Sequence, residues 1–541
     1  MSHFCASSTV RTDSRFVTRI VVVAVLVGLG LLAGAAPLQA QCTLSTVNPS
    51  VTICSPANNA TGLSSPVNVV AGTTDSHSVS VMQIYLDGVK VYEVKAASLN
   101  TNVSMSAATH RLTVQALDSA SQVFKSTIYI TVGSGSPPPP PPPSSGLSNI
   151  KHIIFMVQEN RSADNYFGLM NQYRASQGIN DNAFDGFNPT VQLQEYNGTA
   201  MVSPYHFQTV CHEQVSAGWN ESHYDANGGK MNNFMKTMGS VPSTIDPHGT
   251  RAMGHYDWTD LPFYYDLAFK FATSDRWFSP LLAPTIPNRM YLFAATSAGV
   301  IRPVSPPSGG FPQPTIFDRL MAANVSWRYY YQDSSVMLSY FSTWYKGGSG
   351  HVYNISNYFT DVNGSLPSVV FIERASKTGL DEHPAANIQK GAADVQKIIQ
   401  ALMNSPNWGS SVFILTFDEG GGLYDHVPPA PMPLPDNIPP NLLSTDIKAT
   451  FNQSGFRVPL IVISPWVKPH FVSHVARDYT AILKLIETRF NLPSLTARDA
   501  AADNMTEFFD FSAPSYPTAP NVVPQPLTGT CSFSLEKAPG F

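Results

Sequence analysis

Hydrophobic residues follow two different patterns along this chain. Between residues 42 and 133 they alternate with polar residues in short runs such as "MQIYLDGVKVYEV" and "STIYITV". Alternation with a period of two predicts short, half-buried strands, and Asp87-Gly88 predicts a hairpin turn. About 90 residues of this kind are typical of an immunoglobulin-like β-sandwich. No cluster of titratable residues marks this segment, so the sequence assigns it no chemistry and leaves its ligand unknown.

Residues 148–515 carry continuous apolar runs in place of alternating ones. "HIIFMV", "SVVFIE", "SVFILTF" and "VPLIVIS" are separated by helical stretches such as "NIQKGAADVQKIIQALMNS". Continuous β-rich runs between helices predict an α/β domain with a largely parallel sheet flanked by helices. The long intervening segments are rich in Gly, Pro, Tyr and Trp, as expected of loops that build a site. The proline-rich residues 516–541 are expected to form a tail over the surface.

A proline tract separates these two regions. Pro137–Pro143 form an unbroken run within the predicted linker 134–147. Such a run prefers polyproline II and extends about 3.1 Å per residue, which makes it a semi-rigid spacer of roughly 20 Å. We interpret it as a domain boundary, with recognition by a partner domain as the alternative.

The N-terminal residues predict export. Arg11, Arg15 and Arg19 precede the apolar run Ile20–Ala36, and Ala40 provides a small residue before a cleavage point. This order is typical of a secretory signal peptide, here residues 1–40. We therefore expect a secreted, periplasmic or cell-surface protein; an uncleaved anchor is the alternative, because the apolar run is near the minimum length of a membrane span.

Composition narrows the classes further. The net charge is −5, with 37 acidic against 32 basic residues, which excludes a general nucleic-acid binder. Beyond the signal the chain has an even number of cysteines, which permits disulfides in an exported protein. Cys42 and Cys54 are close in sequence and are predicted to pair, and Cys211–Cys531 then follows by elimination.

Polar groups stand directly after two of the apolar strands. Glu159 and Asn160 follow "HIIFMVQ", and Asp418 and Glu419 follow "SVFILTF" and precede three glycines. Ligands bind outside the carboxyl ends of strands in open parallel sheets, so these groups are expected to meet at one edge. Three close carboxylates repel one another unless a cation neutralises them. The sequence therefore predicts a divalent metal site; oxygen ligands favour calcium, magnesium or manganese, and nearby histidines allow zinc or iron.

Thr285 lies between two prolines in "LLAPTIPNRMYLF", at the start of a predicted helix. It is interpreted either as a helix cap or as a nucleophile activated by an adjacent metal. Asn288 and Arg289 are expected to hold this turn, with a phosphate contact as the alternative for Arg289.

Three histidines are candidates for contacts with a phosphate or a leaving group. His223 lies in "WNESHYDANGG", His383 in "DEHP" and His426 in "LYDHVPP". Each alone is an ordinary polar loop residue. Beside a metal and a nucleophile, each could bind phosphate or donate a proton.

The ordered motifs "IKHIIFMVQENRSADNYFG", "NGGKMNNF", "PTIPNRMYLFAATSAG", "DEHP" and "SPNWGSSVFILTFDEGGGLYDHVPP" resemble the bacterial phosphoesterase family. That family contains phosphatidylcholine-type phospholipases C and a group of acid phosphatases, and it is similar in fold to alkaline phosphatases. The resemblance covers about residues 148–511. It implies Thr285 as nucleophile and catalytic roles for His383 and His426. It also implies metal ligands at Glu159, Asn160, Asp418 and Glu419, with Thr285 beside the metal, and substrate contacts from Asn160 and His223. For the metal it favours calcium or zinc.

The N-terminal segment resembles small immunoglobulin-like modules of exported bacterial enzymes.

The sequence departs from the family pattern at three places. Tyr479 stands where a histidine is common, Asn232 where an aspartate is usual, and "VSAG" replaces a segment that often carries a histidine before Trp219. These departures affect the expected substrate contacts and leave the metal and nucleophile positions unchanged.

The resemblance implies a metal-dependent phosphoric ester hydrolase that works through a phosphothreonine intermediate. A phospholipase C acting on phospholipid diesters, with transient contact to a membrane surface, is the first expectation. An acid phosphatase acting on soluble phosphomonoesters is the alternative. A surface-binding protein with an inactive hydrolase domain is a second alternative, disfavoured by the intact set of site residues.

Overall fold

The computed structural model describes residues 43–133, apart from 59, 87–88, 107–108 and 121, and residues 146–541, apart from 334–336, 346–349 and 375. The chain divides into two compact units at Pro137/Pro138, within the predicted linker. The predicted signal, the proline run, Cys42 with its expected disulfide, and the Asp87-Gly88 turn lie outside the described residues. Among the described residues, no helix combines the length and apolar character needed to cross a bilayer.

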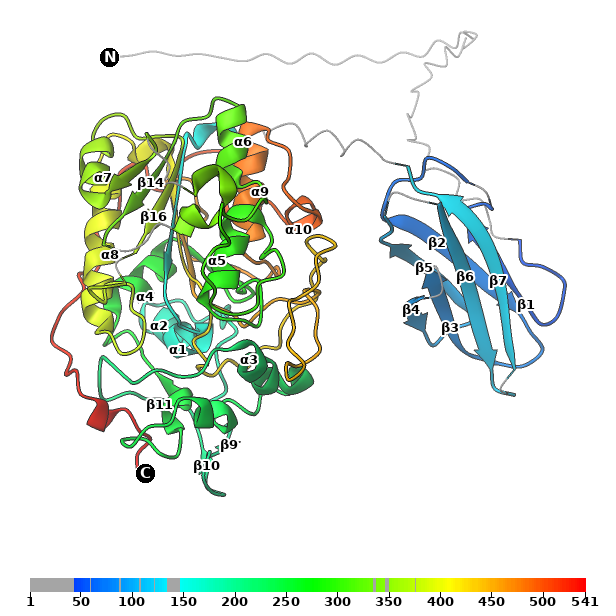
Figure 1. The fold of residues 1–541 in the computed structure, drawn as a ribbon, viewed down its shortest axis with the longest axis horizontal. Coiled ribbons are helices and arrows are strands. Elements are labelled where there is room, and N and C mark those ends of the chain that lie inside the picture. Colours follow the sequence, from blue (N-terminus) through cyan, green and yellow to red (C-terminus); the bar gives the residue numbers. More distant parts are fainter. Residues whose placement is uncertain are drawn as a thin grey trace, which may run out of the picture. The chain divides into compact units, whose positions relative to one another are not determined.

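The first unit is a sandwich of two antiparallel sheets, as the alternating pattern predicts (Figure 1). One sheet has the order β1-β2-β5 and the other β4-β3-β6-β7. Buried side chains from both sheets form one apolar core, with Val69, Met82, Leu112 and Val114 among the least exposed. The strands are β1 (Ser50–Ser55), β2 (Val67–Thr74), β3 (Val79–Leu86), β4 (Val89–Val94), β5 (Ser98–Val103), β6 (Thr109–Asp118) and β7 (Val123–Thr131).

The second unit is built on a largely parallel eight-stranded sheet in the order β15-β14-β16-β8-β17-β18-β13-β19. Every neighbouring pair is parallel except the two that β18 makes. Its strands are β8 (His152–Gln158), β13 (Ala272–Ser274), β14 (Trp327–Tyr331), β15 (Val352–Asn354), β16 (Val369–Glu373), β17 (Ser411–Phe417), β18 (Leu460–Ile463) and β19 (Phe471–Ser473). The central strands β8, β16 and β17 are buried on both faces, which explains their continuous apolar runs.

Helices cover both faces of this sheet. Figure 1 shows α7 and α8 on one side, with α5, α6 and α9 on the other. The α-helices are α1 (Ala163–Phe167), α2 (Met170–Ser176), α3 (Trp219–Ala226), α4 (Pro262–Lys270), α5 (Thr285–Ala294), α6 (Ile316–Ala322), α7 (Ile355–Asp361), α8 (Ile388–Met403), α9 (Thr480–Phe490) and α10 (Ala497–Ala501). Four two-residue strands, β9 (Leu193–Gln194), β10 (Met201–Val202), β11 (Tyr205–His206) and β12 (Gly254–His255), lie in the long loops.

The C-terminal tail is bonded to the rest of the second unit at several points. A disulfide joins Cys211 to Cys531, which confirms the pairing reached by elimination. The N–H of Val210 donates to the carbonyl of Thr530 at 2.8 Å, and the buried Glu536 accepts from the N–H of Glu213 at 2.6 Å. The tail is therefore part of the packed unit, with one of its carboxyl groups fully enclosed.

Candidate active site

Sheet register brings the two predicted carboxylate motifs together. In the parallel pair β8–β17, Gln158 lies opposite Phe417, so Glu159 and Asp418 leave the sheet side by side. The N–H of Asn160 donates to Oδ1 of Asp418 at 3.0 Å. Asn160 has a φ of 58°, a left-handed conformation that asparagine adopts more readily than most residues. These strand ends form the edge at which a ligand would bind.

The glycines after Glu419 allow the chain to pass close to this edge. Gly421 and Gly422 have φ values of 67° and 74°. A Cβ atom on Gly421 would come within 2.5 Å of the carbonyl oxygen of Asn160, and one on Gly422 within 1.9 Å of the carbonyl oxygen of Ser216. Only glycine satisfies both the backbone angles and the close approach at these two positions.

A buried arginine lies among the carboxylates. Arg289 of α5 pairs with Oε1 of Glu159 at 2.7 Å, with Oδ2 of Asp418 at 3.4 Å and with Glu373 at the end of β16. The Tyr329 hydroxyl donates to the second oxygen of Glu373. Arg289 was expected to hold the Thr285 turn or to contact a phosphate; its guanidinium instead bonds to the carboxylates of the site.

The site carries more buried negative charge than Arg289 balances. Burial raises the pKa of Glu159 well above its ordinary value, and the charge of Asp418 raises it further, against the opposing effect of Arg289. Burial and the charge of Asp418 likewise raise the pKa of Glu419. A carboxyl group with a raised pKa is one whose ionised form lacks compensation. Added positive charge at this edge would therefore be favourable.

Thr285 occupies the first position of α5, next to Glu159. Its half-buried hydroxyl donates to Oε2 of Glu159 at 3.2 Å. The turn before it is closed by Asn288, whose Oδ1 accepts from the N–H of Leu281 at 2.8 Å and whose amide donates to the carbonyl of Ala283 at 2.6 Å. The start of a helix favours negative charge, so a phosphate beside Thr285 would meet the positive end of α5.

His383 is joined to the same edge through its own loop. The N–H of Glu159 donates to the carbonyl of Asp381 at 2.8 Å, and the N–H of His383 donates to Oδ1 of Asp381 at 3.2 Å. Nδ1 of His383 donates to the carbonyl of Pro384, which leaves Nε2 as the nitrogen for other partners. Burial raises the pKa of Asp381.

Glu382 anchors this loop in the core. Its carboxylate is fully buried and accepts from Gln158 at 2.8 Å, from the Tyr166 hydroxyl at 2.6 Å and from the Tyr264 hydroxyl. Its φ of 68° is unusual for a residue with a side chain. These bonds hold the backbone of the neighbouring His383 in place.

His223 lies on α3, beside the Thr285 turn. Its Nδ1 donates to the carbonyl of Trp219 at 2.7 Å, and its ring packs 4.2 Å from that of Trp219. Trp219 and Ala283 belong to one buried apolar cluster, which places α3 against the residues before Thr285. Burial lowers the pKa of His223, which favours the neutral ring; because Nδ1 is the donor, Nε2 is then the accepting nitrogen.

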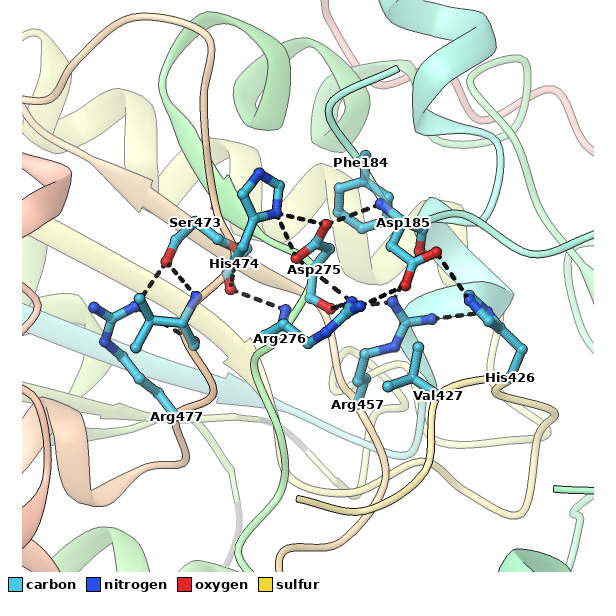
Figure 2. Close-up of polar contacts among 12 residues, drawn as sticks. Phe184, Asp185, Asp275, Arg276, His426, Val427, Arg457, Ser473, His474 and Arg477 are labelled. Atoms are coloured by element: carbon cyan, nitrogen blue, oxygen red, sulfur yellow. Dashed lines mark hydrogen bonds and ion pairs between the residues drawn. The ribbon is translucent and has the colours of Figure 1, made fainter. Parts of the chain in front are cut away.

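His426 belongs to a different network (Figure 2). Its Nδ1 bonds to Asp164 at 2.7 Å and its Nε2 to Asp185 at 3.1 Å. Arg457 pairs with Asp164 at 2.7 Å and with Asp425 at 3.0 Å. No hydrogen bond within the described ranges joins His426 to Glu159, Thr285, Asp418 or Glu419. Of the predicted histidines, His426 is thus the one whose two ring nitrogens are both engaged elsewhere.

Several residues at the site had no predicted role. Glu373 ends a parallel strand beside β8, so the rule that located Glu159 also applies to it. Asp381 stands in the quoted motif "DEHP" but carried no assignment. Tyr479, a departure from the family pattern, is buried and its hydroxyl donates to the carbonyl of Phe417, directly before Asp418.

The residues at this edge fit a divalent cation. Oδ1 of Asn160 is buried and accepts no hydrogen bond among the described residues, so it is free to bind a cation. It stands beside Glu159, Asp418 and Glu419, all oxygen donors of the kind that hard cations prefer. Among the described residues, three other groups of carboxylates and histidines have ligand atoms within 4.8 Å of one another, and this set is not one of them. Here Arg289 pairs with one oxygen of Glu159 and one of Asp418.

Both units match known sequence families. The sequence profile of the Phosphoesterase family matches residues 150–493, and that of a bacterial Ig domain matches residues 49–114. Phospholipase C B of Mycobacterium tuberculosis is 32% identical over 436 residues, covering 70% of this chain and 80% of the relative. Non-specific phospholipase C4 of Arabidopsis thaliana is 32% identical over 400 residues, covering 66% and 71%.

Among solved structures, a protein in the alkaline phosphatase superfamily from Vibrio parahaemolyticus aligns with 63% of this chain and 78% of its own, with 10% identity and a TM-score of 0.30. At that score it supports no argument, and the fold assignment here depends on the strand order.

The largely parallel α/β sheet, with carboxylates at its strand ends and a threonine hydroxyl at the start of α5, fits the enzyme class of these relatives, the hydrolases. The chain belongs to the Phosphoesterase family and carries a bacterial Ig domain before its catalytic domain. It is a phosphoric ester hydrolase.

Proposed function

We propose that this protein is a secreted, metal-dependent phospholipase C that hydrolyses phospholipid diesters through a phosphothreonine intermediate. The observation that carries the proposal is the hydrogen bond from Thr285 to Glu159 at the strand-end edge, where Asp418 also lies. The relatives named phospholipase C support the substrate class.

Thr285 is the proposed nucleophile. Its hydroxyl donates to Glu159, so the proton is directed at that carboxylate and the oxygen keeps its lone pairs for the attack. The oxygen attacks phosphorus in line as its proton passes to Glu159, and the bond from phosphorus to the alcohol breaks, which leaves a phosphothreonine. Water then attacks phosphorus, the bond to the Thr285 oxygen breaks and the hydroxyl regains a proton; two successive displacements give net retention of configuration at phosphorus.

A divalent cation held by Glu159, Asn160, Asp418 and Glu419 would supply Lewis-acid activation of the nucleophile and screen the charge of the phosphate. Calcium and zinc are the proposed candidates. Arg289 keeps three of the surrounding carboxylates fixed, namely Glu159, Glu373 and Asp418.

His383 is the proposed proton donor to the leaving alcohol. Its Nδ1–H is held by the carbonyl of Pro384, so the doubly protonated ring would present its transferable proton at Nε2. His223, with its Nδ1 held by Trp219 and the neutral ring favoured by burial, has Nε2 as an acceptor; it is therefore proposed to contact the phosphate through the attacking water, beside Asn160. His426 is proposed as a further acid–base group.

The mechanism is tested by Thr285→Ala and Thr285→Ser. Thr285→Ala is expected to abolish turnover while the circular dichroism spectrum is unchanged, and Thr285→Ser to retain part of the activity because it keeps a hydroxyl. Acid quenching with ³²P-labelled substrate should trap label on wild-type protein and none on the alanine variant. Substantial turnover by Thr285→Ala would refute the nucleophile.

The substrate class is tested by parallel assays on phosphatidylcholine and p-nitrophenyl phosphate, before and after chelation and with added calcium or zinc. Preference for the diester supports the phospholipase C, and preference for the monoester supports the acid phosphatase. Export is tested by sequencing the N-terminus of protein recovered outside the cytoplasm, where a start near Gln41 is expected.

A further inference from the structure

The immunoglobulin-like domain contains a group of potential metal ligands that the sequence did not indicate. Asp75, His77 and Asp118 each present one ligand atom, and these atoms lie within 4.8 Å of one another. Asp75 follows β2 of one sheet, whereas Asp118 ends β6 of the other. The group therefore lies where the chain crosses between the two sheets.

Both carboxylates are buried and incompletely satisfied. The side chain of Asp118 is 0% exposed and that of Asp75 is 3% exposed. Oδ1 of Asp118 accepts from the N–H groups of Ala120 and Gln122 at 2.9 and 2.7 Å, and Oδ1 of Asp75 accepts from the N–H of His77 at 3.0 Å. Oδ2 of each accepts no hydrogen bond among the described residues. A buried carboxylate oxygen without a partner costs free energy that a cation would recover.

His77 completes the group from the solvent side. Its Nδ1 lies 3.7 Å from Oδ2 of Asp118 and 3.8 Å from Oδ1 of Asp75, too far for hydrogen bonds. Two ligands bound to one zinc ion at about 2.0–2.2 Å in tetrahedral geometry are separated by roughly 3.3–3.5 Å, so the observed spacing needs only a small contraction. The His77 side chain is 55% exposed, which leaves room for water or an outside ligand.

We propose that Asp75, His77 and Asp118 bind a divalent metal ion such as zinc. One coordination position of the ion is open to solvent. The donor set of one imidazole nitrogen and two carboxylate oxygens favours zinc over calcium, which binds six to eight oxygens. The site is independent of the proposed catalytic metal. When bound, the ion ties the turn after β2 to the β6–β7 hairpin and so links the two sheets.

Matched variants of the full chain isolate this site. Asp118→Asn keeps an oxygen to accept from Ala120 and Gln122 but replaces the unpartnered oxygen with an NH₂ group. His77→Ala removes an exposed ligand and leaves the fold intact. Glu93→Gln is the control: it removes one negative charge in the same domain from an exposed carboxylate that Lys90 already pairs.

The experiment is zinc titration of chelator-treated full-length protein by calorimetry, with equilibrium dialysis and metal analysis to count bound ions. Wild type and Glu93→Gln are expected to bind one zinc ion per chain more than Asp118→Asn, and His77→Ala to bind that ion at least tenfold more weakly. Zinc bound at the catalytic domain is common to all four proteins. It therefore cancels when the number of zinc ions bound by a variant is subtracted from that of the wild type. Equal stoichiometry and affinity in all four proteins would overturn the proposal, as would calcium binding at these residues without zinc binding.

Discussion

The pH dependence of stability at His426 can be worked out from its surroundings. Burial alone would lower the pKa of this ring, but the hydrogen bond to Asp164 and the charges of Asp164 and Asp425 outweigh it and raise the pKa to about 9. The ordinary value is 6.5. A group whose pKa is raised on folding stabilises the folded state fully below the unfolded pKa, and this contribution is lost as the pH rises through the folded pKa. The window is therefore pH 6.5 to about 9.

The magnitude follows from the size of the shift. A rise from 6.5 to about 9 corresponds to about 3 kcal/mol at 1.36 kcal/mol per unit. The side chain is 24% exposed, so solvent screening reduces the expected contribution to about 2–3 kcal/mol. Replacing His426 with Gln removes the titrating group and should remove this part of the pH dependence.

The assay is urea denaturation followed by tryptophan fluorescence at pH 6 and at pH 9.5. All seven tryptophans lie between residues 219 and 466, so the signal reports the catalytic unit alone. Wild type should lose about 2–3 kcal/mol more between the two pH values than His426→Gln. Glu536, whose burial raises its pKa to about 8, titrates in the same range, but it is common to both proteins and cancels in the difference.

His474→Gln is the matched control. His474 also bonds to a buried carboxylate, that of Asp275 at 2.9 Å, in the same network (Figure 2), but its side chain is 62% exposed. Its replacement should leave the pH dependence close to wild type. Equal losses in wild type and His426→Gln would refute the assignment of the charged ring to this network.

Three further predictions follow from individual contacts. Arg289→Met removes the buried guanidinium that pairs with Glu159, Glu373 and Asp418. In the presence of chelator it should lower the free energy of unfolding by about 3–5 kcal/mol. A loss below about 1 kcal/mol, measured by urea denaturation, would contradict this. Gly422→Ala forces a Cβ against the carbonyl of Ser216 and should lower the thermal midpoint and activity together, whereas Gly409→Ala, with no atom within 4 Å, should change neither. Cys531→Ser opens a disulfide that spans 320 residues and should cost about 2–5 kcal/mol; reductant should lower the midpoint of wild type to that of the variant, and an unchanged wild type would refute the role of the bond.

The parts of the site that lie along single strands could be predicted from the sequence. Glu159 and Asp418 follow apolar runs, and the rule for parallel sheets brings such positions to one edge without knowledge of strand order. The largely parallel sheet, the glycine-rich turn and Cys211–Cys531 could also be predicted, because each depends on local pattern or on simple pairing. The antiparallel placement of β18 was not predicted.

The groups that sequence reasoning missed depend on contacts between distant segments. Glu373 ends the apolar run "SVVFIE", so the strand-end rule applies to it as well, but its role is visible only from its pairing with Arg289 of α5. Arg289 seemed to support its own turn, because no local pattern shows that α5 directs it at carboxylates from three different strands. The ligand group at Asp75, His77 and Asp118 could not be predicted for the same reason. The sandwich brings Asp118 next to Asp75 and His77, which lie more than 40 positions earlier in the sequence.

The segment that contains Asp418 and His426 serves two networks. Its first half, with Asp418, lies at the strand-end edge. The left-handed turn at Gly421 and Gly422 then changes the direction of the chain. As a result, Asp425 pairs with Arg457 and His426 bonds to Asp164. The two bonds of His426 are unequal: Asp164 is 2% exposed, whereas Asp185 is 39% exposed. Substrate can compete only for the exposed partner. If His426 transfers a proton during turnover, it does so from Nε2, while the buried bond at Nδ1 fixes the ring.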